Sequence, residues 1–247
     1  MKRLTHVALA TLALLICPAS HADTPQVLLD VIAKVSPEAP PTAVQPAAVA
    51  GLYEVIFGST VYYFSADGRY MLGGPLIEVA SRRNLTEAAA QAVERDTLVP
   101  QRLAFLKQLK DKDAIVFSPV KPAHRVTVFT DTDCGWCREL HRHIDQYQAA
   151  GIAVRYVAFP RAGEDSESFR KAQNVWCAAD RKAAITEAKA GKAVPEKVCE
   201  NPVLEQYQAG QKLGVSGTPA ILLDDGRLLG GYVAPNELKR LLDAPGD

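Results

Sequence analysis

Two cysteines three positions apart, Cys134 and Cys137, lie in the stretch FTDTDCGWCREL. The segment RVTVFT before them predicts a strand, and the segment after them predicts a helix. A thiol attacks a disulfide only as its thiolate, and the free N–H groups at the start of a helix stabilise a negative sulfur. Cys134 is therefore the expected nucleophile, and we expect it to be exposed. Cys137, one turn later and more sheltered, is expected to attack a mixed disulfide held on Cys134.

Two other interpretations of this pair compete with redox chemistry. His141 could join both sulfurs in a metal site, but zinc sites usually take their second ligand pair from a separate loop, and no second CxxC follows. A permanently oxidised structural pair would be an unusual staple, because its loop is so short. We therefore expect no metal, and we predict that His141 and His143 are solvated helix residues.

A second feature is the dipeptide Thr218-Pro219 in GVSGTPAILLDDG, just before a predicted strand. A peptide bond before proline can be cis at modest cost, and we predict the cis form here. Such a turn exposes the backbone of the preceding residue, with which a substrate peptide can pair so that its disulfide lies over Cys134. Gly135 and Trp136, between the two cysteines, belong to the same predicted substrate surface.

The first 22 residues have the layout of a secretory signal peptide: two cations, an apolar run and a small-residue end. Cleavage before Asp23 removes Lys2 and Arg3, so 26 basic residues face 28 acidic ones. This charge gives no indication of a nucleic acid partner. Because no later apolar run is long enough to span a bilayer, we expect a soluble, exported protein. Four cysteines remain, and an even number in an oxidising compartment usually indicates disulfides.

The first part of the mature chain predicts a helix and a small antiparallel sheet. A helix is expected at residues 26–35, with one apolar face made of Val27, Leu28, Val31, Ile32 and Val35. The proline- and alanine-rich stretch that follows is expected to lack regular structure until Gly51. The segments LYEVIF, TVYYFS and RYML then predict short strands. Exposed edges of such a sheet are natural pairing surfaces and predict a subunit interface.

A helical segment follows, and the remainder alternates strands and helices. Asn84 with Glu87 resembles a capping box, and Pro100 is expected to interrupt the helix before it resumes. This segment is interpreted as a semi-rigid spacer, and the alternative is a surface helix of one continuous domain. The remainder predicts a mixed sheet with helices. The proposed division comprises a signal peptide (1–22), a dimerisation domain (23–82), a helical linker (83–112) and a catalytic α/β domain (113–247).

Several motifs together resemble the DsbC/DsbG family of bacterial periplasmic disulfide isomerases, within the thioredoxin superfamily. They are PAAVAGLYEV, VTVFTDTDCGWC, VRYVAFPR, VWCAAD and GVSGTPA, and they span nearly the whole chain. The resemblance implies an α+β dimerisation domain, a helical linker and a thioredoxin-like α/β domain with a helical insertion. It also implies a structural disulfide between Cys177 and Cys199. Two departures are Trp136, where the family usually has tyrosine, and a longer segment at residues 81–99.

By the same resemblance, the protein is expected to be a homodimer that reshuffles wrong disulfides in misfolded exported proteins of the periplasm. No cofactor is implied, and a membrane reductase of the DsbD type would restore the dithiol. Two alternatives come from other classes. A DsbG-like thiol-protecting reductase or a dithiol oxidase would share the fold and differ in redox poise. A non-enzymatic dimeric chaperone would hold apolar segments without turnover.

Overall fold

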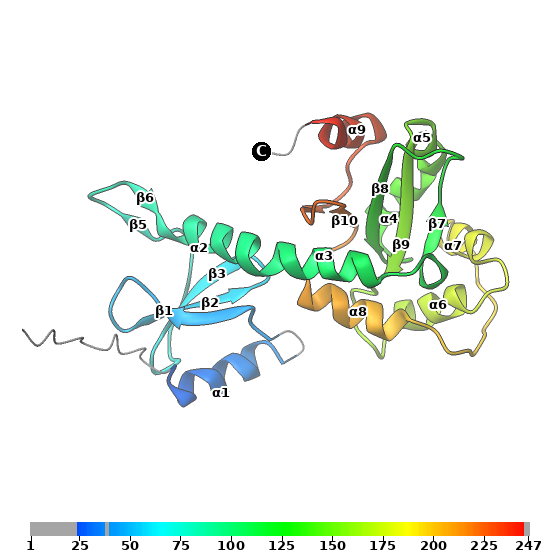
Figure 1. Ribbon diagram of the computed structural model, residues 1–247. Helices are drawn as coiled ribbons and strands as arrows, with labels where there is room; N and C mark the ends of the chain where they lie inside the picture. The colour runs from blue at the N-terminus through cyan, green and yellow to red at the C-terminus, as the bar shows by residue number, and fades with distance from the viewer. Residues whose placement is uncertain (1–23, 38–39, 245–247) are drawn as a thin grey trace, which may run out of the picture.

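The computed structural model describes residues 24–37 and 40–244, which form two folded parts joined by a long helix (Figure 1). The expected signal peptide, residues 1–22, lies outside the described residues. Within the described ranges, no helix combines the length and apolar character needed to cross a membrane.

The N-terminal part is one helix packed on a four-stranded antiparallel sheet. Its elements are α1 (Gln26–Val35), β1 (Ala43–Pro46), β2 (Leu52–Phe57), β3 (Thr60–Ser65) and β4 (Met71–Gly73), and the strands follow one another in the order β1-β2-β3-β4. Leu28 and Ile32, one turn apart on α1, are buried in a core with Tyr53, Val55 and Phe64 of the sheet. The helix therefore covers one face of the sheet.

Two expectations for this part are wrong in detail. Only Leu28 and Ile32 of the expected apolar face are buried, whereas Val27 and Val35 are 51% and 56% exposed. Val27 and Val35 lie near the two ends of α1, whereas the two buried residues lie between them. The stretch before Gly51 also contains a strand, because β1 pairs with β2 from Ala43 opposite Ile56 to Pro46 opposite Tyr53. A proline is tolerated here because β1 is an edge strand.

A short hairpin and a continuous helical rod follow. The hairpin, which the sequence did not predict, pairs β5 (Ile77–Glu78) with β6 (Arg83–Asn84). The rod consists of α2 (Leu85–Val93), a π-helical turn (Glu94–Leu98) and α3 (Val99–Gln108). Asn84 is the N-cap, as expected: its side chain accepts a hydrogen bond from the N–H of Glu87 at 3.1 Å.

Pro100 does not interrupt the rod, contrary to expectation. Proline clashes with the carbonyl four residues earlier and cannot donate to it. Here the turn before it widens, and the N–H of Val99 bonds to the carbonyl of Glu94, five residues back. The π-helical turn lets the chain absorb Pro100 while the rod continues (Figure 1).

The C-terminal part is a five-stranded mixed sheet with helices around it. Its strands are β7 (Ile115–Phe117), β8 (His124–Thr130), β9 (Ile152–Ala158), β10 (Ala220–Leu223) and β11 (Leu228–Gly230), in the order β11-β10-β8-β9-β7. Only β8 and β9 are parallel; the other pairs of this sheet are antiparallel. The helices are α4 (Gly135–Arg142), α5 (Ile144–Ala149), α6 (Glu167–Trp176), α7 (Arg181–Lys189), α8 (Val203–Lys212) and α9 (Pro235–Asp243). The expected fold class is confirmed: a small antiparallel-sheet domain, a long helix and a thioredoxin-like domain with inserted helices.

A disulfide joins α6 to the segment between α7 and α8. Cys177, the C-cap of α6, is bonded to Cys199, with 5.7 Å between their Cα atoms. Residues 190–202 between α7 and α8 have no regular structure. The disulfide joins this segment to the packed helix α6.

One buried arginine fastens the rod to the C-terminal part. Arg102 of α3 is 2% exposed; its Nε donates to the carbonyl of Leu213 at 2.9 Å, and its Nη1 donates to the carbonyl of Gly226 at 3.3 Å. The same Nη1 pairs with the carboxylate of Glu94 on the π-helical turn. One side chain therefore holds two loops of the C-terminal part against the rod.

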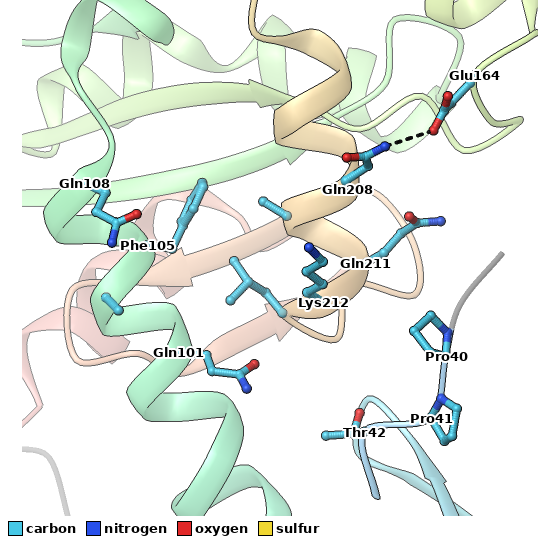
Figure 2. Close-up of a pocket in the computed structure, with 13 residues that line it drawn as sticks. Pro40, Pro41, Thr42, Gln101, Phe105, Gln108, Glu164, Gln208, Gln211 and Lys212 are labelled. Atoms are coloured by element: carbon cyan, nitrogen blue, oxygen red, sulfur yellow. Dashed lines mark hydrogen bonds between the residues drawn. The ribbon is translucent and has the colours of Figure 1, made fainter.

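The two folded parts also touch directly. Gly58, in the turn between β2 and β3, has φ +60°, and a Cβ placed there would lie 3.2 Å from the Cα of Gly214. Glycine is needed for the left-handed backbone and for the close approach. Nearby, Figure 2 shows a pocket of about 730 Å³ between Pro40–Thr42, α3 and α8, lined by Phe105 and several glutamines.

We predict that Arg102→Met loosens the rod from the C-terminal part. Two carbonyls and one carboxylate would lose their donor, at a cost of about 2–4 kcal/mol in the free energy of unfolding. Both tryptophans, Trp136 and Trp176, lie in the C-terminal part. Urea unfolding monitored by tryptophan fluorescence therefore measures this loss of stability. Arg95→Met, which removes the exposed pair of Arg95 with Asp96 on the same rod, is the matched control. Equal midpoints for both variants would contradict the role of Arg102.

Candidate active site

Cys134 lies at the point where β8 has ended and α4 begins. It is the N-cap of α4, and its Sγ accepts a hydrogen bond from the backbone N–H of Cys137 at 3.3 Å. Cys137 lies one turn into the helix, and both cysteines are free. The sulfur of Cys134 thus occupies the position in which a helix N-terminus stabilises negative charge.

The expected exposure of Cys134 is wrong for this structure. Cys134 is 2% exposed and Cys137 0%. The peptide bond between Thr218 and Pro219 is cis, and the carbonyl oxygen of Thr218 lies 3.1 Å from Cys134 Sγ, which donates to it as a thiol. The Thr218 loop therefore packs directly against the first sulfur.

The environment separates the two thiols in acidity. Hydrogen bonding from the Cys137 thiol lowers the pKa of Cys134 to about 5, with further help from Thr218, the N–H of Cys137 and the charge of Arg161 against the opposing effect of burial. Burial raises the pKa of Cys137 well above its usual value, and its donation to Cys134 adds to this. At neutral pH the pair is therefore one thiolate and one thiol. Such a pair can attack a disulfide through Cys134 while Cys137 stays protonated.

A buried carboxylate organises the loop that carries Cys134. Asp131 is 4% exposed and accepts hydrogen bonds from the N–H of Asp133 at 2.9 Å and of Arg161 at 3.1 Å. The guanidinium of Arg161 completes an ion pair with it at 3.2 Å. Asp131 directly follows β8 and Arg161 closely follows the parallel strand β9, so both lie at the same end of the sheet. The sequence analysis missed this pair, although its position after two parallel strands is the signal that points to it.

The exposed surface beside the sulfurs is formed by the residues between them and by a tyrosine near the C-terminus. Trp136 is 63% exposed and stacks on Tyr232, with 6.0 Å between ring centroids and 16° between ring planes. Gly135 is exposed, and a Cβ there would meet nothing within 4 Å. An open glycine and a half-covered aromatic face thus border the buried sulfur of Cys134.

The prediction that both histidines of α4 and its end are solvated is wrong. His141 is 6% exposed; its Nδ1 lies 3.1 Å from the hydroxyl of Tyr156 and its Nε2 2.9 Å from that of Thr186. Burial, together with the charge of Lys189, lowers the pKa of His141 to about 4. His143 is half-buried, with Nε2 3.0 Å from a carboxylate oxygen of Glu139. Amphipathic α4 buries His141 because that position faces the sheet.

The shifted pKa of Cys134 makes a prediction about stability. In the unfolded chain a cysteine has a pKa of about 8.5, whereas folded Cys134 ionises near pH 5. Between these values the folded state binds fewer protons than the unfolded state, so stability rises with pH, is complete above about 8.5, and is lost as pH falls to about 5. Relative to Cys134→Ser, the reduced protein should gain roughly 3–5 kcal/mol in unfolding free energy across this window. Urea unfolding under reducing conditions measures it; a constant difference across the window would contradict the shift.

Two family models match parts of this chain. Residues 112–245 match the family model described as a thioredoxin-like domain, and residues 18–87 match the disulfide bond isomerase protein N-terminal domain. Among solved structures, a disulfide interchange protein from Neisseria gonorrhoeae is 30% identical, covering 54% of this chain and 97% of its own, with a TM-score of 0.48.

Three relatives with similar sequences share the same protein name. The thiol:disulfide interchange protein DsbC of Escherichia coli K12 is 39% identical over 81% of this chain and 80% of its own length. The protein of the same name from Salmonella typhimurium is 38% identical over 82% of this chain and 81% of its own length. That from Haemophilus influenzae is 33% identical over 79% and 80%. This chain belongs to the DsbC family of thiol:disulfide interchange proteins.

Proposed function

We propose that this protein is a periplasmic disulfide isomerase that reshuffles non-native disulfides in exported proteins. The observation that carries the proposal is the arrangement of the pair: Cys134 caps the N-terminus of α4 and accepts a hydrogen bond from the N–H of Cys137, whose own side chain is fully buried. An isomerase needs a thiolate that attacks readily and a second thiol that stays protonated until it attacks the mixed disulfide. The signal-peptide layout of residues 1–22 supports export to the periplasm.

The proposed roles follow from the geometry of the site. Cys134 attacks the wrong disulfide of a substrate, and a thiol of the substrate then displaces it to form a better pairing. If this exchange stalls, Cys137 attacks Cys134 and releases the substrate reduced. The oxidised pair is then restored to the dithiol by a membrane reductase of the DsbD type. The reaction needs no cofactor, because both sulfurs belong to the chain.

Substrate binding is proposed for Thr218, Pro219, Gly135 and Trp136. The backbone of Thr218 lies against Cys134 Sγ, so a peptide that pairs with it brings its own sulfur within reach. Trp136 offers an exposed apolar surface beside the same point.

The proposed homodimer forms through the edge of the N-terminal sheet. β4 is the last strand of that sheet, and it exposes Met71 and Leu72, 56% and 50% of whose surface is open. The other edge, β1, ends in Pro46 and is a poorer template. The proposed domains are the N-terminal part at 23–82, the linker at 83–112 and the catalytic domain at 113–247. The Cys177–Cys199 disulfide is proposed to be structural, since it ties irregular residues to α6.

The first prediction from this proposal separates the roles of the two cysteines. Cys134→Ser should abolish both isomerisation and reduction, because the nucleophile is gone. Cys137→Ser should form mixed disulfides with substrates and hold them. Refolding of a scrambled multi-disulfide protein, with mass spectrometry of trapped adducts, measures both effects. The assignment would be reversed if Cys137 in the Cys134→Ser variant formed substrate adducts as fast as Cys134 does in the Cys137→Ser variant.

The same refolding assay separates the alternatives. A thiol-protecting reductase or dithiol oxidase changes the number of disulfides without restoring the native pairing. A non-enzymatic chaperone improves refolding equally well as Cys134→Ser. The proposed isomerase restores native pairing catalytically and only with Cys134 present.

A second prediction tests the dimer. Leu72→Lys should convert the dimer to a monomer, because two like charges would meet across the paired edges. It should lose most isomerase activity and keep simple thiol–disulfide reduction. Val120→Lys, at a valine 98% exposed on the catalytic part, is the matched control and should remain dimeric. Light scattering on the three proteins gives the mass; a monomeric parent would rule out this assembly.

A further inference from the structure

A buried lysine lies behind the second sulfur, on a helix far along the chain. Lys189, the last residue of α7, is 5% exposed. Its Nζ donates to the hydroxyl of Thr130 at 2.7 Å and to the carbonyl of Cys137 at 3.4 Å. The ring of Tyr156 lies beneath it, 5.3 Å from Nζ to the centroid. The ammonium is therefore held by neutral groups at the back of the CxxC turn.

This environment is costly for a permanent cation. None of the ion pairs among the described residues includes Lys189. A buried charge that lacks a partner tends to release its proton. Burial accordingly lowers the pKa of Lys189 to about 8, against the opposing effects of Cys137, Cys134 and Asp131. The amine can thus exchange a proton near neutral pH.

Thr130 connects Lys189 to the sulfur. The hydroxyl of Thr130 lies 2.7 Å from Lys189 Nζ, and the Thr130 side chain is also close enough to the Cys137 thiol to affect its pKa. Because a hydroxyl both donates and accepts and its hydrogen can rotate, it can pass a proton in either direction. Thr130 is 3% exposed and Cys137 is 0% exposed, so bulk water does not reach this sulfur. The charged and titratable groups that act on Lys189 or face it come from α4, from the loop before it and from β9: Asp131, Cys134, Cys137, Arg138, His141 and Tyr156.

We propose that Lys189 is the proton acceptor for Cys137 in the step that releases substrate, with the Thr130 hydroxyl passing the proton between them. The inference rests on the roles proposed above for Cys134 and Cys137. It deepens that function by naming what activates the second thiol, which the environment otherwise keeps protonated.

The step balances as follows. Cys137 gives its proton through Thr130 to the neutral amine of Lys189 and becomes a thiolate. The thiolate attacks Cys134 Sγ, the new Cys134–Cys137 disulfide forms, and the bond between Cys134 and the substrate sulfur breaks. The electron pair leaves with the substrate sulfur, which takes a proton from solvent. In this step the Cys137 sulfur is oxidised and the departing substrate sulfur is reduced, while Cys134 passes from one disulfide to the other.

The need for an acceptor is greatest in the mixed disulfide. There Cys134 carries no negative charge, so its sulfur no longer holds the proton of Cys137 by accepting a hydrogen bond. Burial remains the main barrier to ionisation of Cys137, and the positive charge of Lys189 is the first of the effects that oppose it. Proton transfer from Cys137 to Lys189 creates an adjacent ion pair instead of an isolated buried thiolate. The two groups titrate as a pair.

The test measures the two thiol steps separately in the full-length protein. Reduced protein is mixed with increasing oxidised glutathione, quenched with acid and analysed by mass spectrometry for mixed and internal disulfides. The slope at low concentration reports attack by Cys134, and the plateau rate reports attack by Cys137. For the parent, the plateau should rise as pH increases through about 8, where the pair loses a proton.

Lys189→Met keeps the length and packing of the side chain but cannot accept a proton. Its plateau should fall roughly 100-fold at pH 7 and lose the rise near pH 8, while the slope stays unchanged. Lys189→Arg keeps the charge and also cannot accept a proton, so its plateau should stay low. Thr130→Val should lower the plateau in the same way. Lys182→Met, at an exposed lysine on the same helix, should leave slope and plateau unchanged.

Each other outcome overturns the proposal. A normal plateau and pH profile in Lys189→Met would show that the lysine is not needed, and rescue by Lys189→Arg would show that only its charge matters. Failure of the proposed cysteine roles has a different signature: Cys137→Ser, with Lys189 intact, would then form no stable glutathione adduct on Cys134.

Discussion

The sulfur of Cys134 at the N-terminus of α4 is the point on which the site depends. A thiolate is stable there because the N–H of Cys137 and the Cys137 thiol point at it, and because the side chain of Thr218 and the charge of Arg161 also favour it. These groups come from α4 and from the loops beside β9 and β10. The parallel pairing of β8 with β9 brings Arg161 to the end of β8, and the antiparallel pairing of β10 with β8 brings Thr218. The sheet is the frame that gathers them.

The N-terminal part and the rod add a second level of organisation. Arg102 ties the rod to the loops at Leu213 and Gly226, and Gly58 touches Gly214 only a few residues before Thr218. The loop that presses on Cys134 is therefore continuous with the contact between the two parts. A disulfide isomerase must hold a large substrate while its thiols try successive pairings. A rigid connection between the N-terminal part and the loop at Thr218 would suit the proposed function.

Local signals made much of this predictable. β2 and β3 have the bounds that their β-rich segments indicated, and Asn84 caps its helix. The strand before the CxxC and the helix after it follow from hydrophobic pattern alone. Features set by distant contacts were not predictable in this way. The burial of His141, the pairing of Asp131 with Arg161 and the position of Lys189 depend on which elements meet in the fold. Pro100 was misjudged because a π-helical turn can absorb a proline.

The fold gives two chemically similar thiols very different acidities. A pH titration of thiolate absorbance in the ultraviolet measures this difference in the reduced protein, with Cys134→Ser and Cys137→Ser as references. One thiolate should appear with a midpoint near pH 5, Cys134→Ser should remove this step, and no second thiolate should appear until strongly alkaline pH. Two thiolates that appear together near the pKa of free cysteine, about 8.5, would contradict this difference in acidity.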